Sequence, residues 1–345
     1  MNNNIKQFVR KNILELSPYS SAREEFSGNE GIFLDANENP YGVYNRYPDP
    51  WQTKLKQKLA EIKSCKPNQI FIGNGSDEVI DLAFRIFCEP NLDKALTFSP
   101  TYGMYQVSAE INAVELIQIP LNNEFQIDKK RVENYLNDKN LKLIFICSPN
   151  NPTGNLLNAD DIELILQNFT GVVMIDEAYI DFAEQDSFLE KLEYYPNLII
   201  IQTLSKAWGL AGIRLGIAYM NEEILSFYNK VKSPYNISSV NQEMALKSLN
   251  RMEEFTLNVQ EILSERTKMI NQLKQLKLVK KIYPTDANFI LVQVKNADEL
   301  YQKLVKKQII IRNRNCAIPN CVRITVGTPE ENQILINELK NIDNG

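Results

Sequence analysis

Lys206 stands out among the charged residues of this sequence because its neighbours are small or apolar. It lies in the stretch TLSKAWGLAGIRLG, where the next charged residue along the chain is Arg214. Lysine is strongly hydrated and seldom buried without a partner, whereas a desolvated lysine has a lowered pKa and becomes a nucleophile toward carbonyl carbons. The structural alternative is a lysine whose stem is buried while its amine reaches solvent. The stretch therefore indicates either carbonyl chemistry or an ordinary structural lysine.

Three further stretches place polar side chains directly after apolar runs of strand length. FIGNGSDE bends at two glycines and begins a helix at Ser76 and Asp77, where free backbone N–H groups suit a phosphate. CSPNNPTG is an irregular loop that aims Asn150 or Asn151 over a strand end, and VVMIDEAYIDF ends a strand at Asp176. Taken singly, these stretches could be a helix cap, a turn and a structural ion pair.

The absence of histidine from the sequence narrows the chemistry. It excludes Ser-His-Asp and Cys-His catalysis and His-ligated metal sites, and we expect no metal site. A cofactor with an aldehyde, a phosphate and a basic ring nitrogen would employ the lysine, the helix start and the aspartate together. Pyridoxal 5'-phosphate (PLP) has these groups, and its protein sites pair a lysine with a charged partner for the pyridine nitrogen. The four stretches together therefore predict a PLP site.

The elements that must position these residues alternate between strands and helices. Apolar runs of strand length and amphipathic segments follow one another, which predicts an α/β fold with a mostly parallel, doubly wound sheet. We expect strands at 69–73, 94–99, 114–120, 141–148, 171–176, 197–205 and 214–220, and helices at 76–88, 102–112, 129–138 and 159–169. Ligands of such sheets bind beyond the carboxyl ends of the strands, where the four stretches lie.

The alternation of strand and helix patterns stops near residue 238, where a long amphipathic helical region begins. Strands expected at 287–294, 309–313 and 321–327, with helices around 297–307 and 329–340, indicate a second and smaller α/β domain. We therefore divide the chain into an N-terminal segment, 1–45, which packs on the active site or small domain, a large PLP-binding domain, 46–240, and a small C-terminal domain, 241–345.

The composition is that of an ordinary globular protein with a net charge of −5 and no long basic runs. A broad basic face for nucleic acid is therefore not expected. The five cysteines are odd in number and form no CxxC pair, and no apolar run suits a membrane span or a signal sequence. We expect a protein of the reducing cytoplasm, without nucleic-acid or membrane partners.

The order of the motifs resembles a known family. NPTG, then D-x-A-Y, then S-K with an arginine eight residues after the lysine, is similar to the fold-type I PLP-dependent aminotransferases. LDANENPYG, RYPDP, GNGSDE, PTYGMY and VRITVGTPEEN resemble more narrowly the histidinol-phosphate aminotransferases of that group. The similarity runs from about residue 14 to 340. It implies a PLP-dependent transferase with a large doubly wound domain and a smaller C-terminal α/β domain.

The resemblance also implies a role for each matching residue around the cofactor. Lys206 would hold the PLP aldehyde and then carry a proton to and from the substrate α-carbon, and Asp176 would pair with the ring nitrogen. Tyr102 would stack on the ring, while Asn151 and Tyr179 would bind its 3'-oxygen. The cofactor phosphate would be bound by Ser76, Asp77, Thr203, Ser205 and Arg214. The catalytic residues implied are thus Lys206, Asp176 and Tyr179.

Substrate binding and assembly are implied in the same way. A tyrosine in the position of Tyr47 reaches the phosphate of the neighbouring subunit in relatives, which implies a homodimer with shared active sites. Arg323 matches an anion-binding arginine of the small domain, and Arg312 is a second basic group near a strand end. Tyr19 and Asn37 match positions that line the substrate pocket. These residues would bind a phosphomonoester substrate.

Two basic residues near these motifs have no role assigned by the resemblance. Arg314 is predicted to lie on a solvated strand end, and Arg23 could be structural or functional.

The activity implied is transamination between L-histidinol phosphate and 2-oxoglutarate, in L-histidine biosynthesis. The alternatives are an aminotransferase for aromatic or other amino acids and a threonine-phosphate decarboxylase of the same fold. A PLP-binding transcription regulator is not expected, because it would need a DNA-binding module before the ENP stretch, and that stretch begins within the first forty residues. A nicotinamide dehydrogenase is not expected either, because that activity would not explain Lys206 and Asp176.

Overall fold

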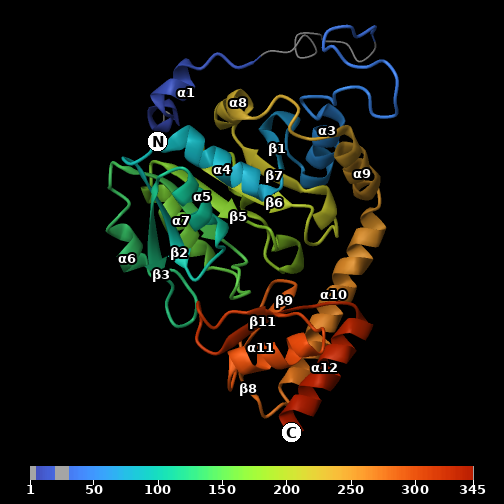
Figure 1. The fold of residues 1–345 in the computed structure, drawn as a ribbon. Helices are drawn as coiled ribbons and strands as arrows, with labels where there is room; N and C mark the ends of the chain where they lie inside the picture. The colour runs from blue at the N-terminus through green and yellow to red at the C-terminus, as the bar shows by residue number, and fades with distance from the viewer. Residues whose placement is uncertain (1–4, 20–30, 345) are drawn as a thin grey trace.

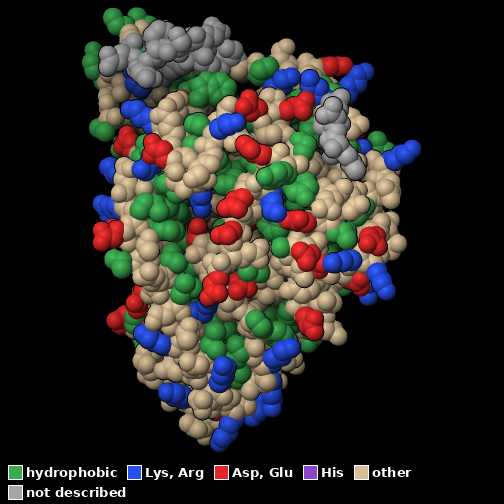
Figure 2. All heavy atoms as spheres, turned by 180° about the vertical axis from the view of Figure 1, so that it is seen from behind, with side chains coloured by type: hydrophobic (Ala, Val, Ile, Leu, Met, Phe, Trp, Pro, Cys, Tyr) green, Lys and Arg blue, Asp and Glu red, His purple; other side chains and the backbone are tan. Residues whose placement is uncertain are grey.

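The computed structural model describes residues 5–19 and 31–344 and shows two lobes joined by a long helix (Figure 1). The larger lobe is built on a seven-stranded sheet and the smaller one on a four-stranded sheet. Arg23, whose role the sequence left open, lies outside the described residues. In the part of the chain that is described, no helix is both long and apolar enough to cross a membrane. Acidic and basic side chains are interspersed on the face of the larger lobe shown in Figure 2.

The sheet of the larger lobe has the strand order β1-β7-β6-β5-β4-β2-β3. Neighbouring strands are parallel except where β7 pairs with β1 and with β6. The strands are β1 (Ile70–Asn74), β2 (Lys94–Ser99), β3 (Glu115–Pro120), β4 (Leu141–Cys147), β5 (Val172–Asp176), β6 (Leu198–Thr203) and β7 (Leu215–Met220). This is the mostly parallel sheet that the alternating pattern predicts.

Helices cover both faces of this sheet because its strands are apolar on both. In β5, Val172 and Met174 pack into one layer of core, and Val173 and Ile175 into the other. The first layer is closed by α1 (Lys11–Glu15), α4 (Ser76–Phe87), α5 (Met104–Ile111) and α8 (Glu222–Val231). The second is closed by α3 (Thr53–Lys63), α6 (Lys129–Glu133), α7 (Ala159–Asn168) and α9 (Ser239–Leu249). Side chains alternate across a strand, so two apolar faces require two layers of helices.

The smaller lobe packs three helices on one antiparallel sheet. Its strand order is β10-β11-β9-β8, formed by β8 (Val279–Ile282), β9 (Phe289–Val294), β10 (Arg312–Asn313) and β11 (Cys321–Thr325). The helices are α10 (Met252–Leu273), α11 (Ala297–Lys306) and α12 (Pro329–Asn344). Their apolar faces share one core with the sheet. Short 3-10 helices elsewhere in the chain lie at Ile5–Phe8, Pro67–Gln69, Ile180–Phe182, Phe188–Lys191 and Ala211–Ile213.

Four of the α-helices and strands in the structure are absent from the sequence-based prediction. The sequence did not indicate α1, α3 or α8, and β8 was also missed. β8 is an edge strand whose two central lysines are exposed, so it lacks the apolar run that marks a buried strand. The predicted helix at 129–138 is shorter in the structure and ends at Glu133.

A reciprocal pair of hydrogen bonds ties the two lobes together beside the NNPTG loop. The backbone N–H of Asp286 donates to the Gly154 carbonyl at 2.7 Å, and the Asp286 carboxylate accepts from the Leu156 N–H at 2.8 Å. Gly154 has φ +89°, and a Cβ there would come within 2.5 Å of the Thr285 hydroxyl. The loop is thus fixed against the smaller lobe at a point where only glycine fits without strain.

Candidate active site

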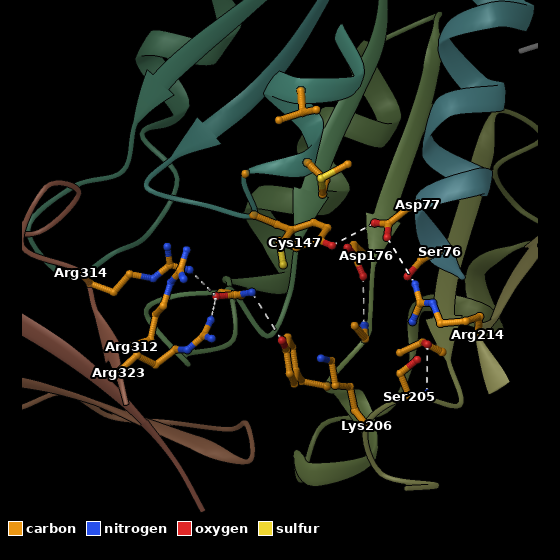
Figure 3. Close-up of a pocket in the computed structure, with 18 residues that line it drawn as sticks. Ser76, Asp77, Cys147, Asp176, Ser205, Lys206, Arg214, Arg312, Arg314 and Arg323 are labelled. Atoms are coloured by element: carbon orange, nitrogen blue, oxygen red, sulfur yellow. Dashed lines mark hydrogen bonds and ion pairs between the residues drawn. The ribbon is translucent and has the colours of Figure 1, made fainter. Parts of the chain in front are cut away.

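A pocket of about 530 Å³ lies between the lobes, and nearly all the predicted site residues line it. Those from the larger lobe are Ser76, Asp77, Tyr102, Asn151, Asp176, Tyr179, Thr203, Ser205, Lys206 and Arg214. Those from the smaller lobe are Arg312 and Arg323, and Arg314, which was not predicted to belong to the site, lies beside them. Figure 3 shows the three arginines on one side of the pocket and Ser76, Ser205 and Arg214 on the opposite side, with Asp176 between them. The carboxyl ends of the strands meet at this edge of the sheet, as doubly wound folds require.

One end of the pocket has the features of a phosphate-binding cup. The helix α4 begins at Ser76, so its free N–H groups and the positive end of its dipole face the pocket. Gly75 has φ +80°, and a Cβ there would come within 2.6 Å of the Arg214 guanidinium. Thr203 and Ser205 line the same end, with the Ser205 N–H donating to the Thr203 hydroxyl at 3.1 Å. Backbone donors, hydroxyls and a guanidinium are the groups that bind a dianion.

Asp176 lies at the end of β5 and is only 4% exposed. One carboxylate oxygen accepts from the Tyr105 hydroxyl at 2.8 Å, and the other accepts from the Ala178 N–H at 3.1 Å. Burial nevertheless raises the pKa of Asp176 to about 6, because desolvation outweighs these hydrogen bonds and the nearby Lys206. A buried acid of this kind favours a cationic partner in the pocket.

Lys206 follows β6 in a turn and points into the pocket (Figure 3). Its amine lies 5.6 Å from the centre of the Tyr179 ring. Solvent reaches the side chain through the pocket, yet partial burial still lowers its pKa, and the positive charge of Arg323 lowers it further. A lowered pKa increases the fraction of free amine, which is the form that attacks a carbonyl carbon.

The carboxylate of Asp77 holds two neighbours of the cup in place. It accepts from the Tyr102 hydroxyl at 2.9 Å and pairs with Arg214 at 3.5 Å. Tyr102 in turn meets the buried Tyr105 edge-on, with ring centres 5.6 Å apart. Two contacts therefore fix the Tyr102 ring at the pocket wall: the hydrogen bond from its hydroxyl to Asp77 and the edge-on packing against Tyr105.

The smaller lobe contributes three guanidinium groups to the pocket. Arg323 and Arg314 both contact the side-chain oxygen of Asn151, the latter at 3.5 Å, and the Asn151 amide nitrogen lies 3.4 Å from the Tyr179 hydroxyl. Burial and mutual repulsion lower the pKa values of Arg314 and Arg323, which remain cationic. The Nε atoms of both are buried without a hydrogen-bond partner among the described residues. Such a cluster of cations suits an anionic substrate group.

Three predicted residues lie away from the pocket of their own chain. Asn37 and Tyr47 line a separate hollow beside the start of α9, where the Tyr47 ring stacks on Tyr235 at 4.5 Å between centres. Tyr19 is 71% exposed and does not line the pocket. A single chain therefore assembles the cofactor side of the predicted site without these residues.

The sequence misjudged one residue of the pocket and missed another that lies behind the pocket wall. Arg314, expected on a solvated strand end, is half-buried and lines the pocket. It faces inward because the turn after β10 folds back toward β11, where the Arg314 N–H donates to the Cys321 carbonyl. Tyr105 was not considered, although it lies in the first turn of α5, three residues after Tyr102, and its ring meets the Tyr102 ring edge-on.

Comparison with known proteins places the chain in a family. A profile of the family "Aminotransferase class I and II" matches residues 33–339. The chain belongs to the class I and II aminotransferases. It is 51% identical to a histidinol-phosphate aminotransferase from Parabacteroides distasonis over 98% of this chain and 99% of that one. It is 50% identical to one from Flavobacterium johnsoniae over 97% and 98% of the two chains.

Solved structures of this aminotransferase family show the same fold. The histidinol-phosphate aminotransferase of Clostridium acetobutylicum superposes with a TM-score of 0.81 at 26% identity, covering 90% of this chain and 98% of that one. The enzyme of Sinorhizobium meliloti, solved in complex with pyridoxal-5'-phosphate, gives a TM-score of 0.76 at 21% identity over 89% and 90% of the chains. The fold-type I architecture and the PLP dependence of the chain follow from its family.

The residues of the pocket fit PLP. The cup at the start of α4 has donors for a phosphate, Asp176 lies buried at the centre, and Lys206 points into the same space. Glycine at position 75 leaves room that a side chain would fill. The pocket thus has a separate group for the phosphate, the ring nitrogen and the aldehyde, as PLP sites require.

Proposed function

We propose that this chain is a transaminase that interconverts L-histidinol phosphate and 2-oxoglutarate with imidazole acetol phosphate and L-glutamate, in L-histidine biosynthesis. The observation that carries the proposal is the opposition of Lys206 and Asp176 in one lobe to three arginines in the other, within a single pocket. The high identity to histidinol-phosphate aminotransferases over nearly the full chain supports the same substrate.

The larger lobe would hold PLP through residues that the structure already fixes. Ser76, Thr203, Ser205 and Arg214 would bind its phosphate, together with the backbone N–H of Asp77. The Asp77 carboxylate would not bind the phosphate, since two anions repel and its oxygens already contact Tyr102 and Arg214.

The ring would be held by the groups deeper in the pocket. Tyr102 would cover one face, Asp176 would pair with the ring nitrogen, and Asn151 and Tyr179 would bind the 3'-oxygen. Asp176 suits this role because burial disfavours its charge unless a cation lies beside it. The contact between the Asn151 amide and the Tyr179 hydroxyl, at 3.4 Å, places the two polar groups on the same side of the pocket.

Bound PLP supplies an electron-withdrawing ring that stabilises negative charge at the substrate α-carbon. Lys206 would hold the cofactor covalently and, once displaced by the substrate amine, move the proton at that carbon. Its lowered pKa increases the fraction of free amine that can act as a base, and a positioned base of this kind accelerates a reaction by about 10²–10⁴-fold. Asp176 would stay ionised and so keep the ring nitrogen protonated throughout.

The three arginines would select the substrate. Histidinol phosphate has no α-carboxylate, so its phosphate is the anionic group available to hold it. Guanidinium groups bind phosphate as a fork, and Arg323 is well placed because Asn151 and the face of Phe289 fix its position. Arg312 and Arg314 line the same side of the pocket and would add to the binding of the phosphate or of the carboxylates of 2-oxoglutarate.

The proposal includes a homodimer in which each chain completes the partner's site. Large hydrophobic side chains of the N-terminal segment are highly exposed: Ile32, Leu34, Tyr41, Val43 and Tyr44. An exposed apolar stretch of this kind is typical of a protein interface. Tyr47, Asn37 and Tyr19, which are remote from their own pocket, would then line the pocket of the second chain.

We also propose a cytoplasmic location. All five cysteines are unpaired in the structure, and Cys316 is exposed. Free exposed thiols are typical of a reducing compartment.

The amino-group donor tests the proposed activity. The PLP-loaded protein is mixed separately with L-histidinol phosphate, L-phenylalanine and L-threonine phosphate, and the visible spectrum is recorded. We expect histidinol phosphate to convert the cofactor to the amino form most efficiently, and 2-oxoglutarate to restore the starting spectrum. Preferential conversion by phenylalanine, or carbon dioxide release from threonine phosphate, would identify one of the alternatives. The variant Lys206→Ala should bind PLP without the visible band of the lysine-bound form and should not turn over.

Mixing two inactive variants tests the shared site. Lys206→Ala and Tyr47→Ala damage different chains of one site if Tyr47 acts across the interface. Mixed dimers would then contain one intact site, and part of the activity should return. No recovery after verified subunit exchange, or a monomer in light scattering, would contradict this part of the proposal.

A further inference from the structure

Tyr105 is a fully buried tyrosine whose hydroxyl faces a charged group. It is 0% exposed, and its hydroxyl donates to one oxygen of Asp176 at 2.8 Å. Its ring stacks on Phe145 with centres 4.9 Å apart and planes inclined by 20°, and meets Tyr102 edge-on. These two ring contacts fix the position of the Tyr105 ring and so hold its hydroxyl beside Asp176.

The other groups that face Asp176 do not replace this donor. From the larger lobe these are Ala178, Asp77, Tyr102, Lys206, Cys147 and Tyr179, and the hydroxyl of Tyr102 donates to Asp77 instead. Of these, the Ala178 N–H bonds the second carboxylate oxygen. Lys206 favours the ionised carboxylate and Asp77 disfavours it, while burial raises the pKa values of Cys147 and Tyr179, which stay neutral near pH 7. Tyr105 is therefore the side chain that gives Asp176 a hydrogen bond.

A hydrogen bond to an ionised carboxylate has two physical effects. It stabilises the charged form against the desolvation that burial imposes, and it fixes the plane of the carboxylate group. For Asp176 desolvation is the dominant influence, and the Tyr105 hydroxyl is the largest of those that oppose it. Without this hydroxyl, a larger share of Asp176 would be protonated at neutral pH.

We propose that Tyr105 is a positioning residue that keeps Asp176 ionised and oriented, so that the carboxylate can receive a protonated ring nitrogen. The inference rests on the proposed role of Asp176 toward the cofactor. The alternative is that Tyr105 only fills the core beside Phe145, in which case phenylalanine would serve equally well. The proposed role and this alternative predict different numbers of protons released when a cofactor ring binds in the pocket.

The test measures protons exchanged when apoprotein binds 4'-deoxypyridoxine 5'-phosphate. This analogue has the ring nitrogen and phosphate of PLP but lacks the aldehyde, so it does not react with Lys206. Calorimetric titrations at pH 7 in two buffers of different ionisation enthalpy give the number of protons released per ligand bound. The variants are Tyr105→Phe and, as a matched control, Tyr219→Phe, because Tyr219 is equally buried and its hydroxyl has no partner among the described residues.

We expect Tyr105→Phe to release about half a proton more than the wild type. In the wild type, with a pKa of about 6, Asp176 is mostly ionised at pH 7, and loss of one hydrogen bond to a charge raises the pKa by about one unit or more. The carboxyl would then start partly protonated and give up that proton on pairing with the ring. Tyr219→Phe should match the wild type. A proton count unchanged in Tyr105→Phe, with native circular dichroism, would overturn the inference.

Asp176→Asn separates this inference from the proposed function. If Asp176 meets the ring nitrogen, this variant binds the analogue more weakly and with a changed proton count. If Asp176→Asn behaves as the wild type, the proposed role of Asp176 fails and the inference about Tyr105 fails with it. If Asp176→Asn differs while Tyr105→Phe does not, the role of Asp176 stands and only the inference about Tyr105 is wrong.

Discussion

The two sides of the active-site pocket differ in how completely their polar groups are paired. On the larger lobe, both oxygens of Asp176 accept hydrogen bonds, and Asp77 pairs with Tyr102 and Arg214. On the smaller lobe, Arg314 and Arg323 keep buried Nε groups without a partner among the described residues. Three cations approach one another there, and the neutral Asn151, which contacts Arg314 and Arg323, offsets little of their repulsion.

The difference indicates that the two sides serve different molecules. A cofactor that stays bound is best served by groups held in one geometry, because no reorganisation is needed when it reacts. Substrates that enter and leave need groups whose strongest partner is the substrate itself. The guanidinium Nε atoms of Arg314 and Arg323, which have no partner among the described residues, are such groups. The pair of hydrogen bonds that Asp286 forms with Gly154 and Leu156 holds the smaller lobe beside the cofactor side.

Removing Arg323 is the strongest way to test the division between the two sides. We expect Arg323→Ala to lower kcat/KM for histidinol phosphate by about 10²- to 10³-fold, since a desolvated guanidinium–phosphate contact contributes about 3–4 kcal/mol. The spectrum of bound PLP should not change, because the contacts of the cup lie in the other lobe. Steady-state kinetics and the visible spectrum measure the two effects.

Arg251→Ala is the matched control for this variant. Arg251 is two-thirds exposed and pairs with Glu254 at the start of α10, away from the pocket. It should leave both readouts unchanged. Loss of bound PLP in Arg323→Ala would show that the arginine belongs to the cofactor side.

Asp176→Asn tests the cost of the buried acid on the cofactor side. The pKa of Asp176 is about 6 in the folded protein against 3.8 in an unfolded chain, so the folded state binds the proton more tightly. The stability that this proton provides is complete below pH 4 and is lost as the pH rises through 6. At about 1.4 kcal/mol per pH unit, the loss is about 3 kcal/mol.

Asparagine does not titrate, so the apoprotein of Asp176→Asn should gain about 3 kcal/mol relative to the wild type between pH 4 and pH 7. Urea unfolding of the two apoproteins across this range gives the difference. A difference that stays constant with pH would mean that Asp176 is not raised in pKa. With PLP bound, the order should reverse near neutral pH, since the ring nitrogen then pairs with the carboxylate.

Arg314→Ala gives the smallest of the expected effects. Arg314 is less buried than Arg323 and contacts Asn151 only at 3.5 Å, so we expect KM for the phosphorylated substrate to rise about tenfold, or about 1.4 kcal/mol. In the wild type, KM measured at increasing ionic strength should also rise, but by less than in Arg314→Ala, because salt screens the attraction between the arginines and the substrate phosphate. An effect as large as that of Arg323→Ala would make the two arginines equal partners in anion binding.

The sequence predicted all seven strands of the larger lobe and the helices α4 to α7, because strong local patterns define these elements, but it missed α1, α3 and α8. β2 begins and ends at the predicted residues, and α4 begins at the predicted Ser76. The predicted cofactor residues directly follow strands of this sheet. Because ligands of doubly wound sheets bind beyond the carboxyl ends of the strands, the sequence predicted that these residues lie close together. The edge strand β8 has exposed lysines at its centre, so it shows no apolar run that would mark a strand. The strand β10, which precedes Arg314, is only two residues long, so no periodic pattern predicts that Arg314 points inward.

The sequence by itself determined the chemistry of this protein: a lysine among apolar residues, an acid at a strand end, donors at a helix start and no histidine. It also fixed which edge of the sheet would carry them. Only the tertiary structure decided the partners. Tyr105 meets Asp176 across 71 residues, and Arg323 meets Asn151 across 172, contacts that no local period encodes. The physical reason is that periodicity reports which face is buried, whereas hydrogen-bond partners depend on how separate elements pack.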